Sequence, residues 1–259
     1  MNPMSTNSWN PFSGKGIGVP GALDRQQKLA GFDQQALSGA TVLCVGAGGL
    51  ISNVAPALVR KGIGALILLD PDVIEPSNLN RQYFWRGDIG LNKAETMARN
   101  LLDACTYPTH ITGLPLSIED AVDTGLELVS GDLAICGIDN NFGRVFASQY
   151  FRDRQVQVIF TAVSRDADHG YIFVQDKAGP CIGCVFPDIA DDQSYPCPGT
   201  PAISDILQLV GALVVYAVDT CLMERKRDWN YRTIHLASGG WDSARMVPAR
   251  EACDVCRSH

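Results

Sequence analysis

The chain has 259 residues, a hydrophobic share of 46% and a net charge of −7, which together are typical of a globular protein with one large domain. The acidic balance and the lack of a basic run argue against a nucleic-acid-binding surface. Nine cysteines without a secretory signal favour metal binding or thiol chemistry over a disulfide framework, and we expect a cytoplasmic protein.

The N-terminal region divides into a lead and a helical segment. Residues 1–21 are polar and rich in Ser, Gly, Asn and Pro, and we expect a flexible lead before a single domain of residues 22–259. A short helical pattern runs from Asp24 to Leu37 and carries Arg25. On residue type alone, Arg25 is a solvated helix arginine.

A strand, a glycine turn, a helix and a second strand follow. Thr41 to Val45 is a short apolar, β-branched run, which is typical of a buried parallel strand. After the helix, a second strand from Ala65 to Leu69 ends in Asp70. This order predicts an α/β, Rossmann-like dinucleotide-binding fold with a mainly parallel sheet, in which the helix N-terminus attracts a phosphate and the carboxylate accepts from ribose hydroxyls. Three glycines form the turn: Gly46, Gly48 and Gly49.

The helix itself carries two unexpected residues. Ile51 stands where a third glycine normally permits close helix–strand packing, and Pro56 removes one backbone hydrogen bond and should kink the helix. The glycine pattern alone is therefore a weak indication of function. The segment after Asp70 is more specific, because it places an arginine and a lysine where a triphosphate needs them and a hydride-transfer enzyme does not. It contains Asp72, Asn78, Arg81, Gln82 and Lys93.

The rest of the chain continues the α/β pattern. A short buried strand from Asp132 to Cys136 leads to Asp139, at a strand end where open α/β sheets bind ligands. Ile206 to Val218 is almost continuously apolar, shorter than a membrane span, and expected in a core or an interface. The other expected elements are helices over Ala94–Ala104 and Glu119–Val129, a helix containing Arg144, a helix starting at Thr200-Pro201, and strands within Tyr107–Leu116 and over Val156–Val163, Gly170–Gln175, Tyr231–Leu236 and Ala244–Val247.

Two Cys-x-x-Cys hooks form a second specific pattern. They consist of Cys181 and Cys184, and of Cys253 and Cys256. Four thiolates can hold Zn²⁺ tetrahedrally and leave no open position for water, so the site would be structural and would tie the C-terminal part back to the sheet. The alternatives are two unrelated buried pairs or redox thiols.

Five pieces in this order resemble the ThiF/MoeB/ubiquitin-activating-enzyme family. They are GAGGL at 46–50, LLDPDVIEPSNLNRQ at 68–82, Lys93, CGIDN at 136–140 and GPCIGC at 179–184. The resemblance spans about Arg25 to Cys256. It implies ATP- and Mg²⁺-dependent adenylation of the C-terminal carboxylate of a ubiquitin-like or sulfur-carrier-like protein with a C-terminal glycine, and release of pyrophosphate. It also supports zinc at the hooks.

The resemblance further implies roles for individual residues. The substrate carboxylate is already ionised, with a pKa of about 3.3–3.7, so its difficulty is repulsion from the triphosphate. Arg81, Lys93 and a Mg²⁺ ion held by Asp139 would neutralise that charge, and Arg25 would be added from a neighbouring subunit of a homodimer or pseudo-symmetric heterodimer. The expected nucleotide site comprises Gly46, Gly48, Gly49, Asp70, Asp72, Asn78, Arg81, Gln82, Lys93 and Asp139.

Cys197 is the remaining candidate catalytic residue. It lies between two prolines in a predicted loop ahead of the apolar helix. In several family members a cysteine here receives the activated carboxylate or takes part in sulfur transfer, and the alternative is an ordinary loop cysteine. A downstream conjugating enzyme is a further expected partner, and neither nucleic acid nor a membrane is expected.

One alternative substrate and two alternative functions remain. A short peptide is an alternative substrate for the same chemistry. A NAD-dependent oxidoreductase explains the glycines and Asp70, but not Arg81, Lys93 or the cysteine hooks. A non-catalytic subunit of an activating complex would have lost its ATP-contacting residues, which are present here.

Overall fold

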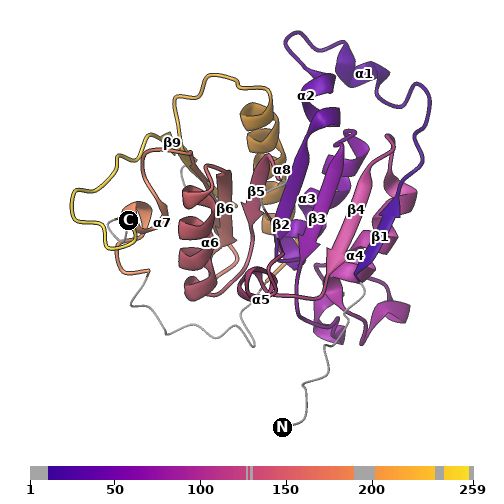
Figure 1. The fold of residues 1–259 in the computed structure, drawn as a ribbon, viewed down its shortest axis with the longest axis horizontal. Coiled ribbons are helices and arrows are strands. Elements are labelled where there is room, and N and C mark those ends of the chain that lie inside the picture. Colours follow the sequence, from indigo (N-terminus) through magenta and orange to yellow (C-terminus); the bar gives the residue numbers. More distant parts are fainter. Residues whose placement is uncertain (1–10, 127, 129–130, 190–201, 237–241, 257–259) are drawn as a thin grey trace.

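The computed structural model describes residues 11–126, 128, 131–189, 202–236 and 242–256, and its centre is a sheet of nine strands (Figure 1). Their order across the sheet is β1-β4-β3-β2-β5-β6-β7-β8-β9. The five strands from β4 to β6 are parallel, and the strands at both ends are antiparallel to their neighbours. The predicted α/β fold with a mainly parallel centre is confirmed. The strands are β1 (Phe12–Lys15), β2 (Thr41–Val45), β3 (Ala65–Leu69), β4 (His110–Leu114), β5 (Leu133–Cys136), β6 (Gln157–Val163), β7 (His169–Gln175), β8 (Tyr231–His235) and β9 (Ser243–Arg245).

Helices cover both faces of this sheet. Side chains of α3, α4 and α8 join one buried apolar cluster, and those of α5, α6 and α7 join another on the opposite face. Strand β2 alternates between them, because Val42 and Cys44 face the first cluster and Leu43 and Val45 face the second. The helices are α1 (Asp24–Gln27), α2 (Gln34–Gly39), α3 (Gly49–Arg60), α4 (Lys93–Leu101), α5 (Ile118–Asp123), α6 (Asn141–Asp153), α7 (Ile182–Val185) and α8 (Ser204–Leu222), with 3₁₀ turns η1 (Pro76–Asn78), η2 (Arg86–Asp88) and η3 (Leu102–Ala104).

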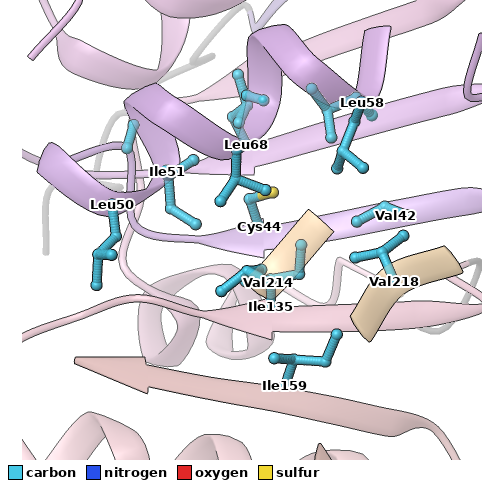
Figure 2. Close-up of a cluster of buried hydrophobic side chains, with 14 of the residues drawn as sticks. Val42, Cys44, Leu50, Ile51, Leu58, Leu68, Ile135, Ile159, Val214 and Val218 are labelled. Atoms are coloured by element: carbon cyan, nitrogen blue, oxygen red, sulfur yellow. The ribbon is translucent and has the colours of Figure 1, made fainter. Parts of the chain in front are cut away.

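Close packing at a neighbouring glycine explains how the fold accepts Ile51 in α3. Ile51 is fully buried, and a Cβ on Gly137 would lie 3.1 Å from its Cγ1, so glycine at that neighbouring turn supplies the space that Ile51 occupies. On the other side, a Cβ on Gly49 would lie 2.8 Å from Leu207 of α8. Pro56 does not end α3, which continues to Arg60. Figure 2 shows residues of this cluster from α3, β2 and α8.

Helix α8 lies against the sheet and α3. Its 19 residues are long and apolar enough to cross a membrane by length and composition, although the core helix of a soluble protein passes the same test, and 61% of the apolar window is buried inside the molecule. Val210 and Val214 are fully buried, whereas Tyr216 is half exposed. The predicted start at Thr200-Pro201 lies outside the described residues, and α8 begins at Ser204.

Three local predictions differ from the structure. The single helical pattern over Asp24–Leu37 is split into α1 and α2, because Gly31 has a φ of +71° and Asp33 caps α2 by accepting from two backbone N–H groups. Helix α5 ends at Asp123 instead of continuing toward residue 129, because Gly125 takes a φ of +76°. The expected flexible lead contains β1, which pairs with β4.

Gly113 on β4 provides a test of this packing. A Cβ there would lie 2.4 Å from the carbonyl oxygen of Ala94 in α4, a backbone atom that cannot rotate away. We expect Gly113→Ala to lower the free energy of unfolding by about 2 kcal/mol, measured by urea denaturation. The matched control is Gly87→Ala, because no atom of the described residues lies within 4 Å of its Cβ position. Equal stability of the two variants would contradict this packing.

Candidate functional site

The glycine turn after β2 lies at the carboxyl edge of the parallel strands. Gly46 has a φ of +98° and donates to the Leu69 carbonyl at 2.7 Å. Gly48 is the N-cap of α3, and as a glycine it offers no side chain to cap this helix end. The first N–H groups of this 12-residue helix are the ones that the sequence predicts would bind a phosphate.

Asp70 holds this turn in shape. Its Oδ2 accepts from the Ala47 N–H at 2.7 Å, and its Oδ1 accepts from the Asp72 N–H at 2.9 Å. Burial raises the pKa of Asp70, while the Lys93 charge and these two hydrogen bonds act to lower it. Each carboxylate oxygen keeps a second lone pair, so this geometry leaves acceptor capacity for a ribose hydroxyl.

Lys93 lies beside Asp70 in a shielded position. Its Nζ is 2.8 Å from Asp72 Oδ2, and its side chain is 12% exposed, against 65% for Asp72. Asn92, which was not predicted as a site residue, donates to the carbonyls of Asp70 and Asp72 at 2.8 and 3.0 Å. It also caps α4, and an asparagine immediately before a helical pattern is the feature that could have revealed it.

The segment from Ser77 to Gln82 forms the other wall near the turn. Asn78 is buried and its Oδ1 accepts from the Glu75 N–H, whereas Arg81 Nη1 donates to the Ser77 carbonyl at 2.7 Å. Gln82 is 7% exposed, and its Nε2 lies 4.0 Å from the Cβ position of Gly48. In the part of the chain that the structure describes, Gln82 Oε1 is buried without a hydrogen-bond partner. An unsatisfied acceptor therefore lies at the helix end.

The turn after β5 lies next to the glycine turn. A Cβ on Gly46 would be 3.2 Å from Ile138, which immediately precedes Asp139. Asp139 is exposed. The turn is fixed by Arg144, whose Nε donates to the Ile138 carbonyl at 3.0 Å, and by Asn140, which caps α6. Arg144 was not predicted as a site residue, because it acts on the backbone and its type gave no separate indication.

Arg25 lies far from these residues within one chain. It is exposed on α1, and the next residue, Gln26, donates through Nε2 to the Lys61 carbonyl at 2.8 Å. Lys61 is the C-cap of α3, while the glycine turn is at its N-terminus. A helix of 12 residues is about 18 Å long, so Arg25 and the glycine turn lie at opposite ends of α3. Figure 1 shows α1 at the end of the sheet where β2 begins. Cys197 lies outside the described residues.

The four hook cysteines form one compact cluster. Their sulfurs all lie within 4.8 Å of one another, and Cys181–Cys253 and Cys184–Cys256 are each separated by 3.5 Å. Four sulfurs bound to tetrahedral zinc at 2.3 Å are about 3.8 Å apart, so the donor set and its spacing fit Zn²⁺. The predicted convergence of the two hooks is thus present, and it is built from α7 and the chain after β9.

Neighbouring backbone groups favour the thiolate of Cys184, whereas burial raises the pKa of Cys181 and of Cys256. Burial acts to raise the pKa of Cys184, but N–H groups of Arg250 and Cys181, with the adjacent thiols, lower it to about 7. A Cβ on Gly183 would lie 2.6 Å from Val255, so only glycine lets the second hook approach. Buried Gln175 joins the cluster to α6, because its Oε1 accepts from the Ile182 N–H and from Ser148.

The chain is similar to known proteins over most of its length. A sequence model described as the ThiF family matches residues 23–255. Curated relatives include "Ubiquitin-like modifier-activating enzyme 5" of Drosophila grimshawi, 32% identical over 60% of this chain and 42% of its own length. Another is "Adenylyltransferase and sulfurtransferase UBA4" of Kluyveromyces lactis, 28% identical over 98% of this chain and 57% of its own. The chain therefore spans about half the length of these relatives.

Solved structures show the same fold. A crystal structure of E. coli MccB superposes with a TM-score of 0.71 at 21% identity, covering 86% of this chain and 69% of that one. A structure of E. coli MccB with ATP gives a TM-score of 0.68 at 22% identity, covering 86% and 68%.

Proposed function

This chain belongs to the ThiF family, and on that basis we propose that it is an ATP-dependent adenylating enzyme. A carboxylate oxygen of the substrate attacks the α-phosphorus of ATP, a new O–P bond forms, and the bond to the β-phosphate oxygen breaks. The products are an acyl-adenylate and pyrophosphate. No general base is required, because the carboxylate is ionised at neutral pH.

The observation that carries this proposal is the set of groups around the N-terminus of α3. Uncapped N–H groups and the shielded ammonium of Lys93 lie around one turn, and the unsatisfied Gln82 carbonyl beside them can accept from a hydroxyl of the nucleotide. Lys93 would exchange its exposed partner Asp72 for a phosphate oxygen, and Asp70 would accept from the ribose. Preorganised donors of this kind stabilise developing charge in phosphoryl and adenylyl transfer.

The remaining predicted roles complete the proposed site. Mg²⁺ would neutralise charge on the phosphates, and Asp139 would hold it as an oxygen ligand. Arg81 would release the carbonyl that it now contacts and turn toward the triphosphate, and Asn78 would orient a phosphate oxygen. Arg25 would be supplied by the second subunit of a homodimer. Zn²⁺ at the four cysteines would be structural.

The proposed substrate is a ubiquitin-like or sulfur-carrier-like protein ending in glycine, and the reaction is placed in the cytoplasm. Cys197 would then accept the acyl group or take part in sulfur transfer, and a conjugating enzyme would act downstream. A short peptide is the alternative substrate. The test is ATP–pyrophosphate exchange with candidate small proteins and with short peptides. Exchange with neither class, at saturating ATP and Mg²⁺, would contradict adenylation.

Arg81→Ala is expected to lower the exchange rate by about 100-fold or more while leaving the thermal unfolding curve unchanged. Its charge is needed in the transition state, and loss of one such electrostatic group typically has this effect. The matched control is Arg86→Ala, an exposed arginine in η2. Near-normal exchange by Arg81→Ala would remove Arg81 from the active site.

A further inference from the structure

Two histidines meet at the end of the β7–β8 pair that is remote from the cysteine cluster. His169 stands directly opposite His235 in the antiparallel register, and their rings are stacked with centroids 5.0 Å apart and planes at 20°. Both are partly exposed. The cysteine cluster contacts Gln175 at the opposite end of the seven-residue strand β7, about 20 Å away.

A carboxylate orients one of the two rings. His169 Nδ1 lies 2.7 Å from Asp168 Oδ1, and Ser164 Oγ donates to the same oxygen at 2.7 Å. Hydrogen bonds from Ser164 and then His169 lower the pKa of Asp168, so this carboxylate is ionised at neutral pH. In the neutral imidazole, a carboxylate at Nδ1 keeps the proton on that nitrogen and leaves the lone pair of Nε2 free for a ligand.

Backbone contacts hold both histidines in place. The Ser164 N–H donates to the His169 carbonyl at 2.8 Å, and the Leu236 N–H donates to the Asp168 carbonyl at 2.7 Å. The His235 N–H donates to the Asp242 side chain at 3.1 Å. The two backbones are therefore fixed relative to each other, and only the imidazole rings need to rotate to receive a ligand.

We propose that His169 and His235 form a metal site, separate from the cysteine cluster, that binds a borderline divalent ion of the Zn²⁺ class with water completing its coordination. Neutral imidazole suits Zn²⁺, whereas Mg²⁺ prefers oxygen ligands. Two nitrogens on one tetrahedral zinc are about 3.4 Å apart, so the two rings, whose centroids are 5.0 Å apart, would have to turn toward each other about χ1 as well as χ2. Asp168 supplies the carboxylate–histidine support that metal-bound imidazoles usually have.

The site is tested by titrating the full chain with ZnCl₂ after the cysteine cluster has been loaded with one zinc. Isothermal titration calorimetry at pH 7.5 should detect the binding of one further zinc ion per chain, with a dissociation constant in the micromolar range. His169→Gln and His235→Gln should each weaken this binding at least tenfold, because each removes one of two nitrogen ligands. His110→Gln on β4 is the matched control and should bind like the wild type.

Asp168→Asn tests the contribution of the supporting carboxylate separately from that of the two imidazole ligands. It keeps both rings, and loss of the supporting carboxylate should weaken binding by about tenfold. If a variant fails to fold, NMR spectra of the wild type provide the test. Zinc should shift the imidazole ring resonances of His169 and His235 but not those of His110. No second ion below millimolar zinc, or unchanged affinity in His169→Gln, would overturn the proposal.

Discussion

Mixing two inactive variants, Arg25→Ala and Asp139→Ala, is expected to restore about a quarter of the wild-type exchange rate. Random reassortment of two-fold dimers places half of the molecules in mixed pairs. If Arg25 acts on the partner's nucleotide, one site of each mixed pair carries both lesions and the other is intact. Each variant alone is expected to be inactive in ATP–pyrophosphate exchange.

The geometry of one chain places Arg25 away from its own glycine turn. Gln26 and Gln34 both donate to the Lys61 carbonyl at the C-terminal end of α3, and Arg225 donates to the Gly31 carbonyl at 2.8 Å. These contacts fix the segment around Arg25 at the end of α3 opposite the glycine turn. No side-chain rotation spans about 18 Å, so Arg25 could contribute to a nucleotide site only from a second copy of the chain.

The matched control mixes Lys93→Ala with Asp139→Ala. Both residues belong to the same chain's site, so every site in a mixed dimer carries one lesion and no activity should return. Sedimentation of the wild type at the assay concentration should show a dimer. A monomer, or equal recovery in both mixtures, would rule out the trans arginine without contradicting adenylation itself.

Cys256→Ser is expected to lower the free energy of unfolding by more than about 4 kcal/mol and to remove zinc from the chain. Loss of a metal ligand belongs to the small class of changes with effects this large, because binding of the metal is coupled to folding. Elemental analysis should find about one zinc per wild-type chain, and urea unfolding should measure the difference in stability. ATP affinity should change much less.

Cys221→Ala is the matched control for that change. Cys221 is also a buried thiol, but it lies on α8 outside the cluster of four. Its substitution should leave the zinc content unchanged. It should lower the free energy of unfolding only by the contribution of one small buried side chain. Wild-type protein without zinc, after purification in the absence of chelators, would defeat the metal assignment.

The parts of the fold that could be predicted are those with continuous apolar runs. Thr41–Val45 and Ala65–Leu69 are the observed bounds of β2 and β3, because Gly46 ends the first run and Gly64 and Asp70 flank the second. The end of α5 was missed, since the conformation of Gly125 decides it. Strand β1 was missed because its four residues carry too weak an alternation to stand out from a polar lead.

The site residues also fall into those that could be predicted from the sequence and those that could not. Residues whose side chains carry charge or bind metal were recognised by type and spacing, and the structure brings Asp70, Asp72 and Lys93 together and closes the cysteine cluster. Asn92 and Arg144 were missed, because they act by holding carbonyl groups of the turns. Such roles depend on tertiary geometry, and composition does not reveal them.

The cysteine cluster also has a consequence for the unfolded chain. Its hooks are 72 residues apart in sequence, and α8, β8 and β9 all lie within the loop that they close. A cross-link over a loop of this length lowers the conformational entropy of the denatured ensemble, which stabilises the folded state by about 4 kcal/mol. A metal that remained bound to the thiolates on unfolding would therefore shorten the search by which α8 returns to the sheet, and this effect would act through the denatured ensemble and not through a contact in the folded molecule.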